Sequence, residues 1–330
     1  MMPSYKRFIL FLTVFIFIIS GGCGGGGRGS FIPPDNQSNF SLGIARDSFT
    51  VNGAPAFLLG VSYFDGRNYR QSDLRSLAEK GYNLIRIFIN LFFDQDGDWR
   101  SGAEQDLIDL VDFADGQGII VDVTILDNES SLGEVPSVRN QVVMNVTEAL
   151  KGRTNVLFDL QNEHDLSHSE LGELSDLVRS IDPDRIVTVS SGEKHILFIN
   201  DDLQEDNIDE EVDIVKVDIL TPHLERNRDW FDMTGHRVGV IKDYLSSIGK
   251  NIPVYLQEEA RRGHSGLNPS KEEFITAALQ ARDADAAGWI FHTDAGFNLS
   301  DQSFFERLDS VERAVVEELP CRVFGGSICN

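Results

Sequence analysis

Short runs of apolar residues alternate along the chain with segments in which apolar residues recur every three or four positions. The first pattern is typical of buried strands, and the second is typical of helices that pack by one face. Eight runs have the length and composition of strands: residues 56–63, 83–89, 119–126, 156–160, 185–190, 212–220, 252–257 and 288–292. Helical periodicity is clearest over residues 72–80, 103–116, 137–150, 169–181 and 271–287, and we expect a last helix over 304–319.

This order of elements predicts an α/β fold. Eight successive strand–helix units in one body fit a (β/α)8 TIM barrel better than an open sheet. We expect an N-terminal hairpin before the barrel, because Asn52-Gly53 is a turn signal between residues 48–51 and 56–63. No glycine fingerprint follows the first strand, which argues against a dinucleotide-binding fold.

The first residues have the pattern of a targeting segment. Lys6 and Arg7 precede an apolar run over residues 8–19, which is short for a membrane span. The following Ser-Gly-Gly-Cys resembles a bacterial lipoprotein signal with Cys23 as the lipidated residue, although Ser20 stands where an aliphatic residue is usual. Ordinary signal cleavage and an uncleaved anchor are the alternatives. Either way we expect an extracytoplasmic protein, secreted or lipid-anchored in a bacterial envelope.

The chain therefore divides into four expected segments. These are a signal or lipoprotein segment (1–23), a Gly/Pro-rich tether (24–46), a single-domain barrel (47–319) and a cysteine-containing tail (320–330). The tail holds Cys321 and Cys329, which could form a small disulfide loop outside the cytoplasm or remain apart, because sequence does not show their separation.

Charge narrows the range of partners. Acidic residues outnumber basic ones by 53 to 29, for a formal charge of −24. Such a surface repels phosphate backbones and anionic headgroups, so we expect no nucleic-acid partner and membrane contact only through a lipid on Cys23. Neutral ligands such as saccharides are compatible with this charge.

Carboxylates follow two of the predicted strands directly. Asn162 and Glu163 end the run at 156–160, and Glu258 and Glu259 end the run at 252–257. In an α/β barrel the carboxyl ends of the strands meet at one face, where the chemistry takes place. Two carboxylates facing each other across such a mouth can hydrolyse a glycosidic bond, one as proton donor and the other as nucleophile.

These motifs resemble clan A glycoside hydrolases, close to the cellulases and mannanases of glycoside hydrolase family 5. In that clan strand four ends in Asn-Glu, as Asn162-Glu163 does here, and strand seven reads Pro, three aliphatic residues, a polar residue and Glu, which residues 253–258 match with one Tyr. Strand two usually carries an Arg, and Arg86 fills that place. The Asn52-Gly53 turn and residues 59–63 are also similar to the clan's entry into its barrel.

The resemblance implies a retaining O-glycosyl hydrolase that acts on a β-linked poly- or oligosaccharide by double displacement and needs no metal or organic cofactor. Glu163 would be the acid/base, its pKa raised by burial and by the charge opposite. Glu258 would be the nucleophile, kept ionised by Arg86, with Glu259 as the fallback because only one of two adjacent side chains can face the mouth. Asn162 would hold the sugar 2-hydroxyl.

Departures from the family concern the sugar contacts. Strand six keeps His223 but lacks the nearby Tyr, and strand eight has His292 where a Trp is usual, with Trp289 earlier in the strand. The third strand ends in Leu126-Asp127-Asn128 rather than in histidines. We expect His223, His292 and Trp289 to bind substrate, in a manner different from the family's.

Two rival functions remain open at this point. The first is a non-catalytic, surface glycan-binding pseudo-glycosidase. The second is a barrel hydrolase that uses His164, His223 and His292 with a metal, and it would lose activity to a strong chelator. His164 and His168 are four residues apart and could share a metal, but no third ligand is evident, so we expect His164 at the mouth and His168 at the surface. Trp230, Phe231 and Phe297 are expected in loops, where they would stack on sugars or pack the rim.

Overall fold

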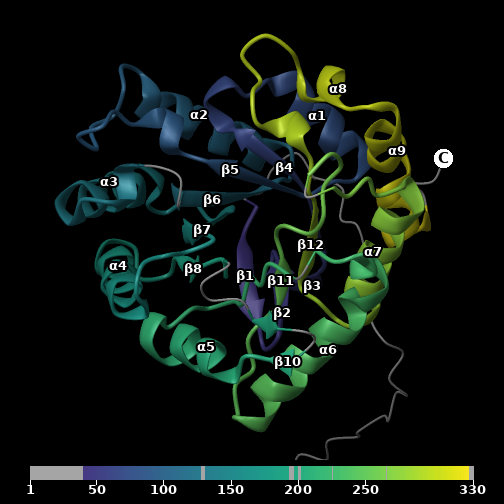
Figure 1. Ribbon diagram of the computed structural model, residues 1–330. Coiled ribbons are helices and arrows are strands. Elements are labelled where there is room, and N and C mark those ends of the chain that lie inside the picture. The colour runs from purple at the N-terminus through teal and green to yellow at the C-terminus, as the bar shows by residue number, and fades with distance from the viewer. Residues whose placement is uncertain are drawn as a thin grey trace, which may run out of the picture.

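The computed structural model describes residues 40–127, 131–192, 197–199, 202–224, 226–264 and 266–326. Its centre is a curled, parallel, seven-stranded sheet (Figure 1). The strand order is β11-β12-β4-β5-β6-β7-β8, so neighbours in sequence are neighbours in space except where β12 returns to β4. The strands are β4 (Leu58–Asp65), β5 (Leu84–Phe88), β6 (Ile120–Asp127), β7 (Val156–Asn162), β8 (Ile186–Thr188), β11 (Tyr255–Leu256) and β12 (Gly288–Phe291).

The two edges of this sheet are joined by residues 217–221, which take the place of the sixth barrel strand. Ser190 pairs with Thr221 and Leu220 pairs with Val254, both as parallel bridges. The amide of Leu220 donates to the carbonyl of Pro253 at 2.9 Å. The expected (β/α)8 architecture is confirmed, with one strand reduced to isolated bridges.

The expected strand over 212–220 is wrong in its first half. Residues 205–215 form α5 (Glu205–Glu210) and a π-helical turn, η4 (Glu211–Val215). Ile208, Val212 and Val215 are buried there, at spacings of four and three residues. That spacing is helical, and it competes with the strand-like alternation that follows it in the sequence.

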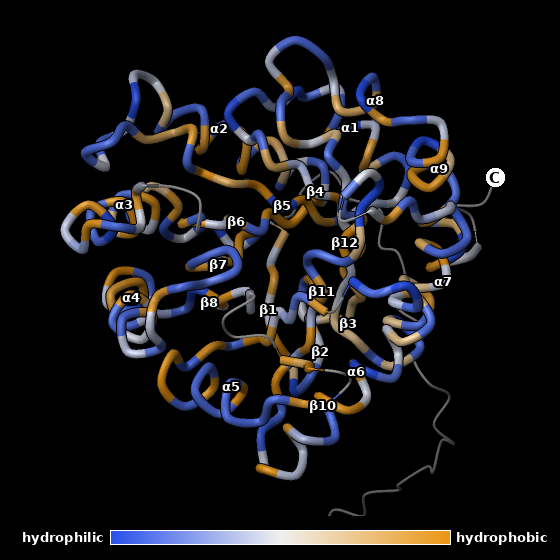
Figure 2. The backbone as a smooth tube through the Cα atoms, in the orientation of Figure 1, coloured by the Kyte–Doolittle hydropathy of each residue, from blue (hydrophilic) through white to orange (hydrophobic). Residues whose placement is uncertain are grey.

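Helices surround the sheet in chain order, and their apolar residues face it (Figures 1 and 2). They are α1 (Gln71–Lys80), α2 (Ala103–Gly116), α3 (Pro136–Leu150), α4 (His168–Ile181), α6 (Trp230–Ser247), α7 (Lys271–Asp283), α8 (Phe304–Arg307) and α9 (Ser310–Phe324). Shorter elements are the strands β9 (Phe198–Ile199) and β10 (Asp202–Leu203) and the 3₁₀ turns η1 (Gly66–Asn68), η2 (Asn90–Phe92), η3 (Ser131–Gly133) and η5 (Asp294–Gly296).

Five helices lie within a few residues of their expected positions, but the C-terminal helix and α6 differ from expectation. The helix expected over 304–319 is two helices, and α9 continues through Pro320 to Phe324. Leu319, Pro320 and Val323 are all buried, so tertiary packing carries the helix past the proline. The helix α6 has no counterpart among the expected elements.

The protein has two apolar cores, one on each face of the sheet. The larger lies between sheet and helices. The smaller fills the interior of the barrel and includes Leu58, Leu84, Ile120, Leu157 and Ile290.

A small antiparallel sheet covers the amino-terminal end of the barrel. It consists of β1 (Leu42–Ala45), β2 (Ser48–Val51) and β3 (Ala54–Ala56), and its Phe49 packs edge-on against Tyr255 at 5.9 Å between ring centroids. The expected hairpin is thus a three-stranded sheet, and the folded body begins before Asp47 because β1 belongs to it.

Several expectations about the ends of the chain fall on residues that are not described. The signal segment, Cys23 and most of the tether lie outside the described residues, as does Cys329. Cys321 is disulfide-bonded. Within the described ranges, no helix is both long enough and apolar enough to cross a membrane.

Candidate active site

The two glutamates singled out in the sequence converge at the carboxyl end of the barrel. Glu163 follows β7 and Glu258 follows β11, two strands that lie near opposite edges of the seven-stranded sheet. One carboxylate oxygen from each and a ring nitrogen of His223 all lie within 4.8 Å of one another. Retaining glycosidases hold their two carboxyl groups about 5–5.5 Å apart, and inverting ones about 6.5–9.5 Å. The two carboxylates therefore lie close enough for a small group to contact both of them.

Glu163 is held in an unusual backbone conformation. Its φ is +43°, in the left-handed region that non-glycine residues seldom adopt. Its amide donates to the hydroxyl oxygen of Ser190 at 3.3 Å. Gly192 packs so closely that a Cβ added there would lie 2.6 Å from the Cα of Glu163. The segment after β8 therefore supports Glu163, although nothing in its sequence predicted this.

The charge on Glu163 differs from the expectation. Its Oε1 lies 3.3 Å from Nδ1 of His223 and 3.6 Å from Nη2 of Arg226. The hydrogen bond with His223 outweighs burial, and together with the charges of His223 and Arg226 it lowers the pKa of Glu163. The prediction of a raised pKa is wrong for this arrangement, because two basic neighbours outweigh the negative charge of Glu258.

Four basic side chains of the described part of the chain surround the carboxylate of Glu258. Its Oε1 accepts from Nη1 of Arg86 at 2.6 Å, and its Oε2 accepts from Nη2 of Arg226 at 3.1 Å. Burial opposes ionisation, but the charges of His292, His223, Arg86 and Arg226 outweigh it and lower the pKa of Glu258. The carboxylate is therefore ionised at neutral pH, as a nucleophile must be.

Arg86 contacts Glu258 from inside the barrel. It is fully buried, and its guanidinium also donates to Asp159 at 2.8 Å, to the side-chain oxygen of Asn162 at 2.9 Å and to Thr124 at 2.9 Å. The surrounding carboxylates raise its pKa further, so it stays charged. Arg86 thus connects Asn162, beside one glutamate, directly to the other glutamate.

Glu259 faces away from the mouth. Its Oε1 accepts from the hydroxyl of Thr234 at 2.9 Å, and its Oε2 accepts from the indole N–H of Trp289. Burial raises the pKa of Glu259 to about 7. Glu258 is therefore the strand-end glutamate that faces Glu163.

The expectation that Trp289 binds substrate is wrong. Its side chain is fully buried in the larger core, on the helix-facing side of β12. Its only polar atom is taken by Glu259. An aromatic floor for a sugar cannot come from this residue.

His292 contacts the site through its second ring nitrogen. Nδ1 lies 2.9 Å from the carbonyl oxygen of Glu259 and donates a hydrogen bond to it. In this tautomer Nε2 is the acceptor. Nε2 lies 3.2 Å from Nη1 of Arg261 and 3.9 Å from Oε2 of Glu258. Burial lowers the pKa of His292 to about 3. The ring is therefore neutral at pH 7, and its charge lowers the pKa of Glu258 only under acid conditions in which the ring is protonated. At pH 7 Arg86 and Arg226 carry the positive charge beside Glu258.

Two arginines of the site were not found from the sequence. Arg226 lies three residues after His223, in the segment that leads from the bridging residues 217–221 to α6. Arg261 follows the strand-seven motif and lies over the ring of Phe297 at 5.2 Å. In the sequence, the only indication of either arginine is that a basic residue follows each motif by three positions. Basic residues after a strand are common, so this indication is weak.

Of the three aromatic residues expected in loops, only Phe297 is exposed near the mouth. It is 42% exposed and stacks against Phe64 at 4.4 Å. Trp230 and Phe231 instead begin α6, and Trp230 is buried in the core.

The three histidines proposed as a metal site do not come together. Among the described residues, His164 groups with His168 and Glu211, whereas His223 groups with Glu163 and Glu258. His164 and His168 are both buried, so neither the mouth position expected for His164 nor the surface position expected for His168 is found.

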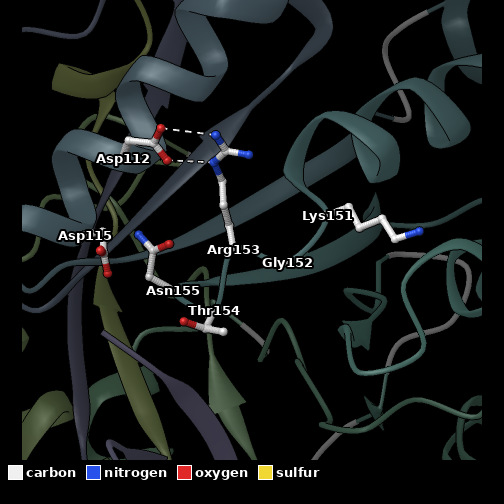
Figure 3. A pocket seen from close by; sticks show the side chains of 7 residues that line it. All are labelled: Asp112, Asp115, Lys151, Gly152, Arg153, Thr154 and Asn155. Atoms are coloured by element: carbon white, nitrogen blue, oxygen red, sulfur yellow. Dashed lines mark hydrogen bonds and ion pairs between the residues drawn. The ribbon is translucent and has the colours of Figure 1, made fainter. Parts of the chain in front are cut away.

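A hollow at the opposite end of the barrel is unrelated to these groups. It is lined by residues 151–155, before β7, and by Asp112 and Asp115 of α2 (Figure 3). Arg153 closes one side by pairing with both oxygens of Asp112. The carboxylate pair lies past the other end of β7.

Comparison with known proteins supports the architecture. No family model and no curated protein matches the sequence. The fold is similar to a glycoside hydrolase family 5 mannosidase from Rhizomucor miehei (TM-score 0.65, 13% identity, 87% of this chain and 98% of that one). It is also similar to an endo-β-1,4-mannanase from Thermotoga petrophila (0.61, 12%, 82% and 77%) and a family 5 protein from Bacteroides vulgatus (0.62, 12%, 81% and 65%).

Two further structures of this kind hold sugars: a variant of the Rhizomucor mannosidase with mannosyl-fructose, and a Prevotella bryantii family 5 variant with a xyloglucan tetradecasaccharide. The protein therefore has the barrel fold of the glycoside hydrolase family 5 enzymes, with a carboxylate pair at the mouth of the barrel.

Proposed function

We propose that this protein is a retaining glycoside hydrolase that acts on a β-linked poly- or oligosaccharide. The observation that carries the proposal is the approach of Glu163 and Glu258 to within 4.8 Å at the barrel mouth. The oligosaccharides held by proteins of the same fold favour the same substrate class.

The chemistry would run in two displacements. In the first, the carboxylate of Glu258 attacks the anomeric carbon while the carboxyl of Glu163 protonates the leaving oxygen, so the glycosidic C–O bond breaks as a glycosyl ester forms. In the second, Glu163 takes a proton from water, which attacks the same carbon and releases Glu258. Asn162, positioned by Arg86, supports the sugar 2-hydroxyl.

Arg226 has to leave the pair before this cycle can begin. Its Nη2 lies between the carboxylates, 3.1 Å from Glu258 and 3.6 Å from Glu163, where the anomeric carbon would sit. The side chain is 20% exposed, so it can swing outward. Its departure removes a positive charge from Glu163, and the proton that the first step needs then binds more tightly.

The test is release of reducing sugar from a panel of β-glucans, β-mannans and β-galactans. We expect release by the wild type and loss of at least a hundredfold in Glu163→Gln and Glu258→Gln, because each removes a reacting group. Glu173→Gln on the exposed face of α4 is the matched control. Equal turnover in wild type and both site variants would refute the assignment.

A second function, glycan binding without turnover, is favoured by one observation. Arg226 forms ion pairs with both glutamates in this structure. A protein that binds glycans without hydrolysing them could keep this arrangement. A binding protein would retain oligosaccharides from the same panel without releasing sugar, and Glu163→Gln would bind as the wild type does.

We also propose that the chain is exported and anchored through Cys23, on the sequence of residues 1–27 alone. Incorporation of labelled palmitate into the wild type, and its loss in Cys23→Ser, would support the anchor. A Cys23→Ser protein that fractionates with membranes as the wild type does would count against it.

A further inference from the structure

A second cluster of ligand-type side chains lies behind the carboxylate pair. It consists of His164, directly after Glu163, His168, the first residue of α4, and Glu211, the first residue of η4. One ligand atom from each lies within 4.8 Å of the other two. The exposed fractions of the three residues are 0%, 6% and 1%, so solvent does not balance their polarity.

The buried carboxylate of Glu211 is the strongest indication that a ligand binds at this cluster. Within the part of the chain that is described, neither of its carboxylate oxygens has a hydrogen-bond partner. Among the described residues, its ion-pair partner is His164, whose Nε2 lies 3.6 Å from Oε1. An ionised carboxyl buried in this way is very costly, so either a proton or a cation has to accompany it.

The orientation of His168 favours a cation. Its Nδ1 lies 2.7 Å from Oε2 of Glu210, which is half exposed. Metal-binding histidines characteristically engage a carboxylate with one ring nitrogen and present the other to the ion. Nε2 of His168 is then its ligand atom, and its ring stands at 69° to that of His164, with 5.2 Å between centroids.

We propose that His164, His168 and Glu211 bind one divalent transition-metal ion, of which zinc is the best fit. Two imidazoles and one carboxylate are a ligand set that suits zinc and its neighbours rather than magnesium or calcium. In a tetrahedral site with bonds of about 2.0–2.1 Å, ligand atoms are separated by about 3.4 Å. The 3.6 Å between His164 and Glu211 requires little adjustment.

The position of this cluster gives the ion a structural role. It would tie together the end of β7, the start of α4 and the π-helical turn η4, and α4 is in contact with both of the others. Turns of the π type occur often at functional sites. Because His164 is the next residue after Glu163, the ion would also stiffen the backbone that carries the candidate acid/base.

The test is zinc binding by the full chain after dialysis against a chelator. We expect isothermal titration with zinc chloride to give one site per chain, zinc to remain after desalting, and the melting temperature to rise with zinc but not with magnesium. His168→Ala and Glu211→Gln should lose the retained zinc and the zinc-dependent rise. His236→Ala, an exposed histidine on α6, is the control and should behave as the wild type does.

Glu211→Gln separates the cation from the proton, because glutamine has the shape of a protonated glutamate and is expected to fold. If the wild type retains no zinc and melts at the same temperature as Glu211→Gln with or without the ion, Glu211 is a protonated structural acid and the metal site is overturned. Zinc retained equally by Glu211→Gln would overturn it as well. Neither readout depends on glycosidase activity.

Discussion

Arg226 allows the electrostatics of the pair to be tested without knowing the substrate. The change is Arg226→Met, which keeps an unbranched apolar stem and removes the guanidinium and its charge. The guanidinium lies 3.6 Å from Glu163 Oε1. Two unit charges at that separation attract each other by about 1 kcal/mol in a water-like dielectric and by about 5 kcal/mol at an effective dielectric of about 20.

The lower end of this range applies, because the side chains of Glu163 and Arg226 are 28% and 20% exposed. A free-energy difference of about 1.4 kcal/mol changes a proton-binding constant tenfold. Removing the positive charge favours the neutral carboxyl, so the pKa of Glu163 should rise, and its proton affinity should increase by about an order of magnitude. The alkaline limb of kcat/KM, which requires protonated Glu163, should move to higher pH.

The assay is a carboxyl ¹³C NMR titration of protein labelled in its glutamates, with Glu163→Gln to assign the signal. Arg228→Met is the matched control, since it removes the same charge from an exposed position two residues along the loop. An unchanged or lower midpoint for Glu163 in Arg226→Met would refute the reasoning. An equal rise in Arg228→Met would show that only the net charge matters.

Three further changes test the supports of the site. Gly192→Ala should lower kcat by at least tenfold and destabilise the fold by about 1–3 kcal/mol, because the new Cβ would lie 2.6 Å from the backbone of Glu163. Arg86→Met should cost about 3–5 kcal/mol in urea unfolding, because it removes the buried guanidinium that pairs with Asp159 and leaves Glu258 with Arg226 as its remaining arginine. Burial raises the pKa of Glu259 from 4.5 to about 7, so its contribution to stability is present below pH 4.5 and lost as pH rises to about 7. Glu259→Gln cannot ionise and should remove roughly 3 kcal/mol of that pH dependence in unfolding curves.

Each of these expectations has an outcome that would contradict it. For Gly192→Ala the comparison is Gly239→Ala, since a Cβ at Gly239 of α6 meets nothing within 4 Å. Equal activity in both would mean that Gly192 does not set the position of Glu163. Arg86→Met with wild-type stability would contradict the anchoring role of Arg86. A Glu259→Gln protein whose stability varies with pH as the wild type's does would show that Glu259 stays ionised.

The barrel and the meeting of its strand-end carboxylates could be predicted from the sequence. The alternation of strand-length apolar runs with helical segments depends on which side chains each element buries, and that is a local property. Glu163, Glu258 and Arg86 belong to the ends or interior of parallel strands. Because such strands share one carboxyl edge, their meeting follows from topology once the barrel is assumed.

The strand-seven motif favoured Glu258 over Glu259, but strand alternation by itself does not explain why Glu258 faces Glu163. Tyr255 and Gln257 both bond Asp122 inside the barrel, at 2.9 Å and 2.7 Å, and strict alternation would then turn Glu258 outward. The strand ends at Leu256, however, and the chain beyond it places Glu258 in the mouth. The residue at which β11 ends depends on how far its pairing with β12 extends. That pairing is a long-range contact, which the local sequence does not determine.

The amino-acid pattern was enough to predict the fold class and the edge of the sheet where acidic residues gather. Four features of the site depend on how the chain folds: the lowered pKa of Glu163, the bridging Arg226, the burial of Trp289 and the meeting of Glu211 with two histidines. The physical reason is that burial patterns repeat along the chain within a few residues. Charge interactions depend on distances through space between residues far apart in the chain, such as Arg86 and Glu258, which are 172 positions apart.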